Sequence, residues 1–449
     1  HLYFPDVGSE NEVPLDKMML LTDAWDSEII VTTFEQLLHS LIGNRAALLR
    51  KFHNIVNSII ILDEIQAIPL EHWMLVNQTL TNLAKTFNVR IILMSATRPV
   101  IFEGQFEAVP EPEHLFLKVD RIRIVPCIDT EVKAAEVSKF FFSKWDGVSS
   151  ALLVLNTIKS SKLVYTALSE HLGSRAVRFG SVKQEGSLED ESKVILAYLS
   201  TSIVPSERRR RVKMLGDLLK SGRKVILVST QAVEAGVDLD FGVAFRDLGP
   251  LDSIVQVAGR CNRGWRYGER GEVYVIRVVD DEGRGDAEKV YGHILPSITL
   301  NILRSKGCID ERDLLPIVNS YYKEVAYRCN TQSRDEFLEA IRYLDFKKLS
   351  YFTLIKEEPK ISIFIELDDN ATFALRRFKE MLRKLDASDL REILEGRAEL
   401  RKAKAELESY IVNVWADDRV KSLNDIVENV GIKYVRRPVA TAYYDLETG

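Results

Sequence analysis

The chain has 449 residues, of which 46% are hydrophobic and 28% are charged, and its formal net charge at pH 7 is −5. These values indicate a globular protein of two or three domains and give no general signal for nucleic-acid binding, so any such contact must use a local surface. The four cysteines have no metal-ligand spacing, and neither a signal peptide nor a membrane-spanning apolar stretch occurs, so we expect a soluble cytoplasmic protein without disulfide bonds.

Five short apolar runs, each followed by polar residues, are the main architectural signal. Continuous runs of this length favour strands that are buried on both faces, as in a parallel sheet. Stretches between them, such as 34–49 and 70–83, have helical periodicity, so we predict βαβ units and an α/β fold of doubly wound parallel sheets. In such sheets the ligand site lies outside the carboxyl ends of the strands. The runs and the polar residues behind them are 29–31 with Thr32 and Thr33, 59–62 with Asp63, 91–94 with Ser95, 151–155 with Asn156 and Thr157, and 225–228 with Ser229 and Thr230.

Changes in composition divide the chain into segments. A proline-interrupted acidic stretch at 110–113 indicates a linker between two α/β units. After the second unit the pattern becomes mainly helical, and the last region has one expected strand, 361–367, and a charged amphipathic helical stretch, 373–412. The predicted segments are a first α/β unit at 1–112, a second at 113–280, a helical linker at 281–350 and a C-terminal accessory domain at 351–449.

Asp63 and Glu64 follow the second apolar run, and their carboxylates suit phosphoryl transfer. Asp63 at a strand tip can hold a magnesium ion through water, while Glu64 can orient or deprotonate the attacking water. Gln66 can contact the γ-phosphate or relay to the second domain. The structural alternative is a strand end followed by a polar turn that starts a helix.

Gln256, Arg260 and Arg263 are spaced by four and then three residues, so on a helix they would share one face. Two guanidinium groups beside an amide suit a phosphate chain, because arginine offers rigid bidentate donors. Supplied across a cleft, such arginines stabilise the charge that develops on the γ-phosphate. The alternative is a solvated basic helix face.

Hydroxyl groups at the strand ends are further candidates. Ser95 and Thr97 could hydrogen-bond the Asp63 region and couple hydrolysis to domain movement, although Ser-Ala-Thr is also an ordinary turn. In the segment 229–238, Gly236 permits a tight turn and Asp238 can reach a ribose or the opposing domain. Six residues at strand ends could contact a nucleic-acid backbone without reading its sequence, or could simply end their strands. They are Thr32, Thr33, Asn156, Thr157, Ser229 and Thr230.

Two other groups of residues have ordinary explanations. The arginine run 208–211 could touch a nucleic-acid backbone, and a solvated helix start explains it equally well. The seven histidines include no His-Asp pair and no metal-binding spacing, so we interpret them as structural.

In their order along the chain, these motifs resemble those of superfamily 2 helicases with two RecA-like domains. Residues 63–66 match the second motif of that superfamily, 95–97 the third, 230–238 the fifth and 256–263 the sixth. Within this superfamily, two segments are similar to the CRISPR-associated helicase of type I interference systems. They are Val-Thr-Thr-Phe-Glu-Gln-Leu-Leu-His at 31–39 and Asp-Glu-Ile-Gln-Ala-Ile-Pro at 63–69. Residues 155–160 and 198–202 support this, and the resemblance covers roughly residues 20–280.

The resemblance implies tandem RecA-like domains, ATP and Mg²⁺ as cofactors, and translocation along displaced single-stranded DNA. It implies recruitment to a guide-RNA surveillance complex and an HD nuclease module, fused or separate, that degrades this strand. Two features of the family are absent from the 449 residues: the Gly-Lys-Ser/Thr phosphate loop and the His-Asp nuclease centre. We expect the loop to precede His1, so that the first RecA-like domain lacks its N-terminal half and the chain alone is inactive.

Two other functions remain open from the sequence. One is a different superfamily 2 helicase that acts on DNA or RNA, which would not depend on a guide-RNA complex. The other is a nucleic-acid-binding module without turnover, because the nucleotide cradle is missing. The presence of a phosphate loop upstream in the native gene would argue against the second function.

Overall fold

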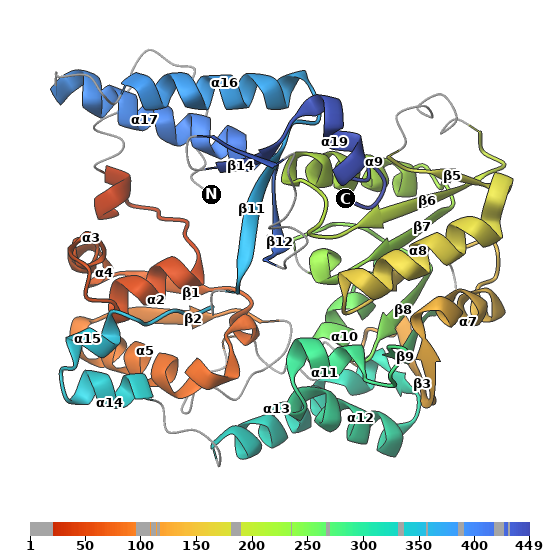
Figure 1. The fold of residues 1–449 in the computed structure, drawn as a ribbon. Helices are drawn as coiled ribbons and strands as arrows, with labels where there is room; N and C mark the ends of the chain where they lie inside the picture. Colours follow the sequence, from red (N-terminus) through yellow and green to blue (C-terminus); the bar gives the residue numbers. More distant parts are fainter. Residues whose placement is uncertain are drawn as a thin grey trace.

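In the computed structural model, the described residues form three separate sheets of two, eight and four strands (Figure 1). It describes residues 21–95, 108, 114, 117–180, 190–234, 236–265, 270–330, 336–355, 358–384, 390–416, 426–429 and 432–449. In these ranges no helix is both long enough and apolar enough to cross a membrane. The predicted linker at 110–113 lies outside the described residues.

The first sheet has two parallel strands, β1 (Ile59–Leu62) and β2 (Arg90–Leu93), joined through α5 (Trp73–Phe87). The preceding helices are α2 (Phe34–Ile42), α3 (Ala46–Leu49) and α4 (Phe52–Ile55). Helix α5 buries its apolar face in the core, whereas Ile59 and Ile61 are each 60% exposed. The prediction that this sheet is buried on both faces is therefore wrong for the described chain. Residues 29–31 form no strand and are exposed, because no described strand pairs with them.

The second sheet carries the largest core, and its strand order is β10-β3-β9-β8-β4-β7-β6-β5. All its pairings are parallel except that of β10 with β3. Strands β4 and β7 are buried along their whole length, as the continuous apolar runs 151–155 and 225–228 predict. Strand β8, which was not predicted and contains Arg246 and Asp247, is also buried along its whole length. The strands are β3 (Ile122–Lys133), β4 (Ala151–Val154), β5 (Ala176–Arg178), β6 (Val194–Leu199), β7 (Val225–Ser229), β8 (Val243–Asp247), β9 (Gly271–Val279) and β10 (Ile309–Asp310).

Helices cover both faces of this sheet. On one face, α7 (Val137–Lys144) and α8 (Ile158–Leu172) pack against Leu153 and its neighbours. On the other, α9 (Pro205–Lys220) and α10 (Leu251–Ala258) pack against the core that contains Leu152. The alternation of neighbouring β4 residues between two cores is the doubly wound arrangement expected from the sequence.

The helical linker connects the two α/β domains. Helices α11 (Asp286–Tyr291), α12 (Ile294–Lys306) and α13 (Leu314–Asn330) follow β9, and α12 packs against β3. Helices α14 (Glu336–Arg342) and α15 (Phe346–Leu349) lie against the first domain, where Asn44 Nδ2 donates to the Phe346 carbonyl at 2.7 Å. The linker therefore contacts both domains.

The C-terminal region is an α/β domain with its own sheet, ordered β12-β11-β14-β13. The sequence predicted one strand here, whereas four form: β11 (Lys360–Ile365), β12 (Ile411–Trp415), β13 (Ile426–Asn429) and β14 (Ile432–Val435). The expected helical stretch is two helices, α16 (Asp369–Lys384) and α17 (Leu390–Glu408), which pack against each other. The three additional strands were missed because they are only four or five residues long.

The end of the chain docks onto the second domain through the arginine run of α9. After α19 (Arg437–Tyr443), residues 444–449 lie beside Arg211, whose side chain is fully buried. Its Nη1 donates to the carbonyls of Tyr198 at 2.9 Å and Glu447 at 2.6 Å, and its Nη2 donates to the Leu446 carbonyl. Arg211 is therefore a packing residue rather than a nucleic-acid contact or a solvated helix start.

Candidate active site

Asp63 and Glu64 lie in the turn that directly follows β1. Asp63 is exposed, and its Oδ1 accepts a hydrogen bond from the Glu64 backbone N–H at 3.0 Å. Glu64 has φ 53° and ψ 45°, a left-handed conformation, and the 3₁₀ turn Ile65–Ala67 begins immediately after it. This conformation is unusual for a residue other than glycine, and such residues cluster at functional sites.

Gln66 connects this turn to the end of β2. Its side chain is 8% exposed; Nε2 donates to Glu64 Oε2, and Oε1 accepts from Ser95 Oγ at 2.6 Å. The two strand ends are held together by the Met94 N–H, which donates to the Leu62 carbonyl at 2.8 Å. The predicted contact between Ser95 and the Asp63 region is thus made through Gln66. Thr97 lies outside the described residues.

Arg260 and Arg263 follow α10 instead of lying on it, so the expectation that one helix face carries them with Gln256 is wrong. The helix ends at Ala258, with Gly259 as its C-cap, and Gln256 is half-buried in its last turn. Arg260 Nη2 donates to the Glu234 carbonyl at 3.0 Å, which holds the side chain against the loop after β7. Because both arginines lie in a loop, their side chains do not need helical spacing to reach one site.

Arg263 belongs to a second cluster in the same loops. Its Nη1 is 3.0 Å from Asp238 Oδ1, and its backbone N–H donates to Asp240 at 2.7 Å. Gly236, with φ +71°, lies in the turn that precedes Asp238, as the prediction of a tight turn requires. The structure therefore brings together Arg260, Arg263 and Asp238 from segments that are 22 residues or more apart in the sequence.

The two halves of the site come from different domains and lie within electrostatic reach of each other. Burial lowers the pKa of the Arg260 guanidinium, and repulsion from Arg263 lowers it further. The carboxylates of Asp238 and Glu64 act in the opposite direction, so Glu64 of the first domain lies within electrostatic reach of Arg260. Figure 1 shows α10 on the side of its domain nearer to β2. A carboxylate and a guanidinium placed in this way can act in the same phosphoryl transfer, the carboxylate on the attacking water and the guanidinium on the γ-phosphate.

The predicted nucleic-acid contacts differ in their accessibility. Thr33 caps α2 by accepting from the Gln36 N–H at 3.2 Å, and Thr157 caps α8 by accepting from the Ser160 N–H at 3.1 Å. Both caps are the structural role of threonine at a helix start. Thr32 and Thr33 are exposed, whereas Ser229 is fully buried and its hydroxyl donates to the Leu199 carbonyl at 2.7 Å. Thr230 is 4% exposed, so neither hydroxyl of the 229–230 pair is presented to solvent.

Asn156 belongs to a buried network that the sequence did not reveal. Its Nδ2 donates to Asp247 Oδ2 at 2.7 Å, and its Oδ1 accepts from Arg246 Nη1 at 2.6 Å. Arg246 is fully buried and also donates to Glu234 Oε1 at 3.0 Å. Asn156 is therefore a structural residue in this structure and does not present its amide to a ligand. An Arg-Asp pair inside an apolar strand is the only sequence signal for this network.

Within this network, burial has a clear effect on the protonation of Asp247. Burial raises the pKa of its carboxyl to about 7, against the opposing charge of Arg246 and the hydrogen bond from the Val278 N–H. The carboxylate of Asp286 raises this pKa further. The network lies directly behind the loop that carries Glu234, and Glu234 in turn holds Arg260 through its carbonyl.

The residues fit a nucleotide with magnesium. Asp63 is an exposed carboxylate at a strand end, and within the described chain its Oδ2 accepts no hydrogen bond. Mg²⁺ commonly uses one or two protein carboxylates together with substrate phosphates and water, so one such ligand is sufficient. No group of three or more His, Cys, Asp or Glu side chains that could hold a metal ion occurs among the residues searched, which are the described ones.

Comparisons with known proteins show what this chain is similar to. The family model described as CRISPR-associated nuclease/helicase Cas3, C-terminal, matches residues 147–266. A CRISPR-associated nuclease/helicase Cas3 from Haloferax volcanii is 29% identical, with 63% of this chain and 38% of that protein covered. The crystal structure of T. fusca Cas3 matches with a TM-score of 0.61 at 16% identity, covering 90% of this chain and 53% of that chain. A chain of a CRISPR RNA-guided surveillance complex in a pre-nicking state matches with a TM-score of 0.57 at 17% identity, covering 91% and 55%.

The structural matches confirm the predicted fold class, an α/β fold with tandem RecA-like sheets. The chain spans less than two thirds of the length of each of these matched proteins. Together with the motifs at Asp63 and Arg260, the matches to the family model and to the Haloferax volcanii protein lead to one conclusion: this chain is similar to the CRISPR-associated nuclease/helicase Cas3 proteins, and its residues 147–266 match the C-terminal model of that family.

Proposed function

We propose that this chain carries the hydrolytic half of an ATP-dependent translocase, or helicase, that moves along single-stranded DNA in a type I CRISPR interference system. The observation that carries this proposal is the placement of Glu64 in the turn after β1 of the first domain and of Arg260 in the loop after α10 of the second, within electrostatic reach of each other. A base and an arginine that approach one site from two RecA-like domains are the arrangement that phosphoryl transfer requires.

Each residue then has a definite task. Asp63 would hold a magnesium ion, which would supply positive charge against the phosphate oxygens when bound. Glu64, turned by its left-handed backbone, orients and deprotonates the attacking water. Arg260 stabilises the charge that develops on the γ-phosphate, and Arg263 supports it from the same loops. Gln256 and Asp238 bind the nucleotide from the second domain, and Gly236 supplies the turn that brings Asp238 there.

Coupling to DNA uses the hydrogen-bonded contacts behind the site. On the first domain, Ser95 and Gln66 join the ends of β1 and β2 next to Glu64, so that a change in one strand end reaches the other. On the second domain, Arg246 joins Asn156 to the Glu234 loop that holds Arg260. The exposed Thr32 and Thr33, together with the start of α8 at Thr157, contact the phosphate backbone.

The partners follow from the family. A structural relative is a chain of a surveillance complex, and the Haloferax volcanii relative is named a nuclease as well as a helicase. We therefore propose that the chain acts with a guide-RNA surveillance complex and an HD nuclease module. The described residues hold no metal cluster of the kind such a nuclease needs, so that activity belongs to other residues or to another polypeptide.

The deciding measurement is ATP hydrolysis with and without single-stranded DNA, for this chain alone and for the chain extended upstream. We expect DNA-stimulated hydrolysis in the extended protein, and we expect Glu64→Gln to abolish turnover while nucleotide binding persists. Hydrolysis that Glu64→Gln does not diminish would remove Glu64 as the base. Single-stranded DNA binding without hydrolysis in either protein would support a non-catalytic module. Hydrolysis that is indifferent to a guide-RNA complex would support a different superfamily 2 helicase.

A further inference from the structure

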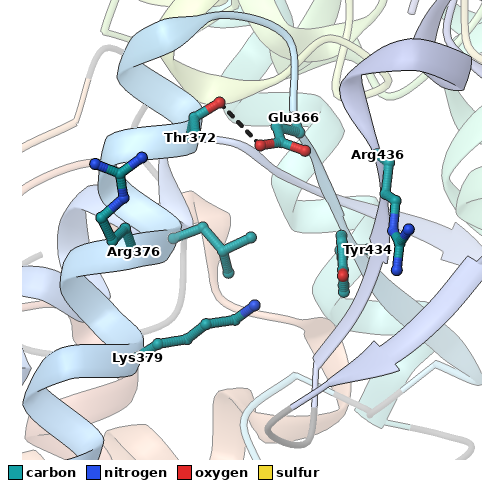
Figure 2. Close-up of a pocket in the computed structure, with 7 residues that line it drawn as sticks. Glu366, Thr372, Arg376, Lys379, Tyr434 and Arg436 are labelled. Carbon is teal, nitrogen blue, oxygen red and sulfur yellow. Dashed lines mark hydrogen bonds between the residues drawn. The ribbon is translucent and has the colours of Figure 1, made fainter.

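The C-terminal domain contains a hollow of about 300 Å³ that is separate from the candidate active site (Figure 2). One wall is α16, which contributes Thr372, Arg376 and Lys379. The opposite wall comes from β14 and the residue that follows it, with Tyr434 and Arg436. The volume lies at the small end of the range for ligand pockets, about 300–1,000 Å³, which suits a single nucleotide unit rather than a larger ligand.

The floor of the hollow is aromatic and has a cation beside it. Tyr434 is only 6% exposed, and Lys379 Nζ lies 5.3 Å from the centroid of its ring. Figure 2 shows Lys379 extending from α16 towards Tyr434, with Arg436 next to the ring on the other wall. The cation–π contact holds the ammonium group over the floor.

The hollow has a net positive charge because three cationic side chains and a single carboxylate line it. Glu366 Oε1 accepts from Thr372 Oγ1 at 2.8 Å, and its Oε2 accepts from the Arg437 N–H at 3.2 Å. Against this one negative charge stand three cationic side chains, those of Arg376, Lys379 and Arg436.

Two of these cations lack the carboxylate partner that neighbouring arginines have. Arg377 pairs with Glu399 at 2.9 Å and also with Glu406, and Arg437 pairs with Asp369. Within the part of the chain that the structure describes, neither Arg376 nor Arg436 forms an ion pair, and both are exposed. The fold thus neutralises the arginine next to each of them in sequence and leaves these two at the mouth of the hollow.

We propose that this hollow binds the phosphate of a nucleotide unit, and that its source is a nucleic-acid strand held by the C-terminal domain; the choice of a strand rests on the function proposed above. Arg436 and Lys379, which lie beside the Tyr434 ring from the two walls, donate to the phosphate oxygens, and Arg376 adds a third positive charge at the rim on α16. The hydrophobic edge of the floor lies beside the sugar or base of the same unit. A free nucleotide offers the same chemistry, and the experiment separates the two sources.

The test compares the purified full chain with the double variant Arg376→Gln/Arg436→Gln. Both side chains are exposed, so the variant should fold, and its thermal unfolding checks this. The matched control is Lys402→Gln/Lys404→Gln, which removes two positive charges from α17 in the same domain. The probes are a short fluorescein-labelled oligo(dT), dTMP and inorganic phosphate, titrated at several salt concentrations.

The expected result is a loss of about tenfold in oligo(dT) affinity for the pocket variant, while the control changes little. The slope of log affinity against log salt should fall by about 0.7 for each phosphate group that the variant no longer neutralises. If dTMP or phosphate binds with the same affinity as oligo(dT), and only the pocket variant loses this binding, the phosphate site is supported and its ligand is a free phosphate. Equal binding of all probes by the pocket variant and the control overturns the site.

The same titrations separate this site from the proposed translocase function. Binding of dTMP that depends on the pocket, without any binding of oligo(dT), would keep the phosphate site and count against action on single-stranded DNA. Failure of the wild-type chain to bind any of the three probes overturns the phosphate site itself.

Discussion

Arg246 and Glu234 form a buried ion pair, with Arg246 Nη2 at 3.0 Å from Glu234 Oε1, directly behind the loop that holds Arg260. Arg246 is fully buried and the Glu234 side chain is 11% exposed. The same guanidinium donates to Ser253 Oγ at 2.7 Å and to Tyr291 Oη at 3.1 Å. The pair therefore joins β8, α10 and α11 to the segment that carries the candidate active-site loop.

Removing Arg246 should destabilise the second domain strongly. Arg246→Met leaves the carboxylates of Glu234 and Asp247 buried without their cation, a loss of about 3–5 kcal/mol in the free energy of unfolding. Urea unfolding of Arg246→Met, Glu234→Gln and the double variant forms a double-mutant cycle. We expect the double variant to lose less than the sum of the single variants, because no buried charge remains unpaired on the Glu234 side. Additive losses would contradict a coupled pair.

Arg260→Ala should reduce ATP turnover far more than stability. The expected fall is about 10³-fold or more, because a guanidinium that acts on developing phosphate charge is removed, whereas the folded state loses only its bonds to two loop carbonyls. Arg284→Ala is the control, since Arg284 forms an exposed ion pair with Glu282 and should leave turnover unchanged. The assay is DNA-stimulated hydrolysis in the upstream-extended protein, with a thermal melt of each variant. An unfolded Arg260→Ala protein would instead make Arg260 a structural residue.

The stability of the second domain should fall as the pH rises from about 4 to about 7. Asp247 in the folded protein has a pKa of about 7, above its ordinary value of 3.8. Between these values the folded state binds more protons than the unfolded state, so deprotonation on raising the pH favours unfolding. Burial also raises the pKa of Glu234, which acts in the same direction. For Asp247 the full effect is on the order of 4 kcal/mol.

The measurement for Asp247 is the free energy of unfolding by urea at several pH values between 4 and 8. Asp247→Asn cannot ionise, so its curve should lose most of this slope although the variant itself is less stable. The groups that face Asp247 are Arg246, Asn156 and Asp286, and Arg246 keeps its charge throughout this range. Identical slopes for the wild type and Asp247→Asn would show that Asp247 does not titrate between these values.

Arg211→Met should loosen the end of the chain from the second domain. The change leaves the carbonyls of Tyr198, Leu446 and Glu447 without their donor, which should cost about 2–4 kcal/mol and increase amide hydrogen exchange at residues 444–449. Arg210→Met is the matched control on the same helix, because Arg210 is 44% exposed and pairs with Glu207 near the surface. Hydrogen exchange that rises equally in both variants would show that Arg211 does not anchor the tail.

Several elements could be predicted from residues alone because local pattern determines them. The runs at 151–155 and 225–228 contain only apolar residues, and such runs are stable only inside a sheet covered on both faces, which is what β4 and β7 show. The same rule failed at 29–31 and 59–62. Burial depends on what packs against a strand, and no described element covers Ile59 or Ile61.

Pattern in the sequence determined the order of the motifs, the α/β class and the resemblance to the Cas3 helicases, because these depend on residue types at short spacings. Only the tertiary structure decided that Arg260 follows α10 instead of lying on it, and that Glu64 and Arg260 of two different domains lie within electrostatic reach of each other. It also decided that Asn156 and Arg211 are buried and that Arg376 and Arg436 flank one hollow. These relationships join residues that are far apart in the sequence, and they arise from how sheets and helices pack, which no local pattern records.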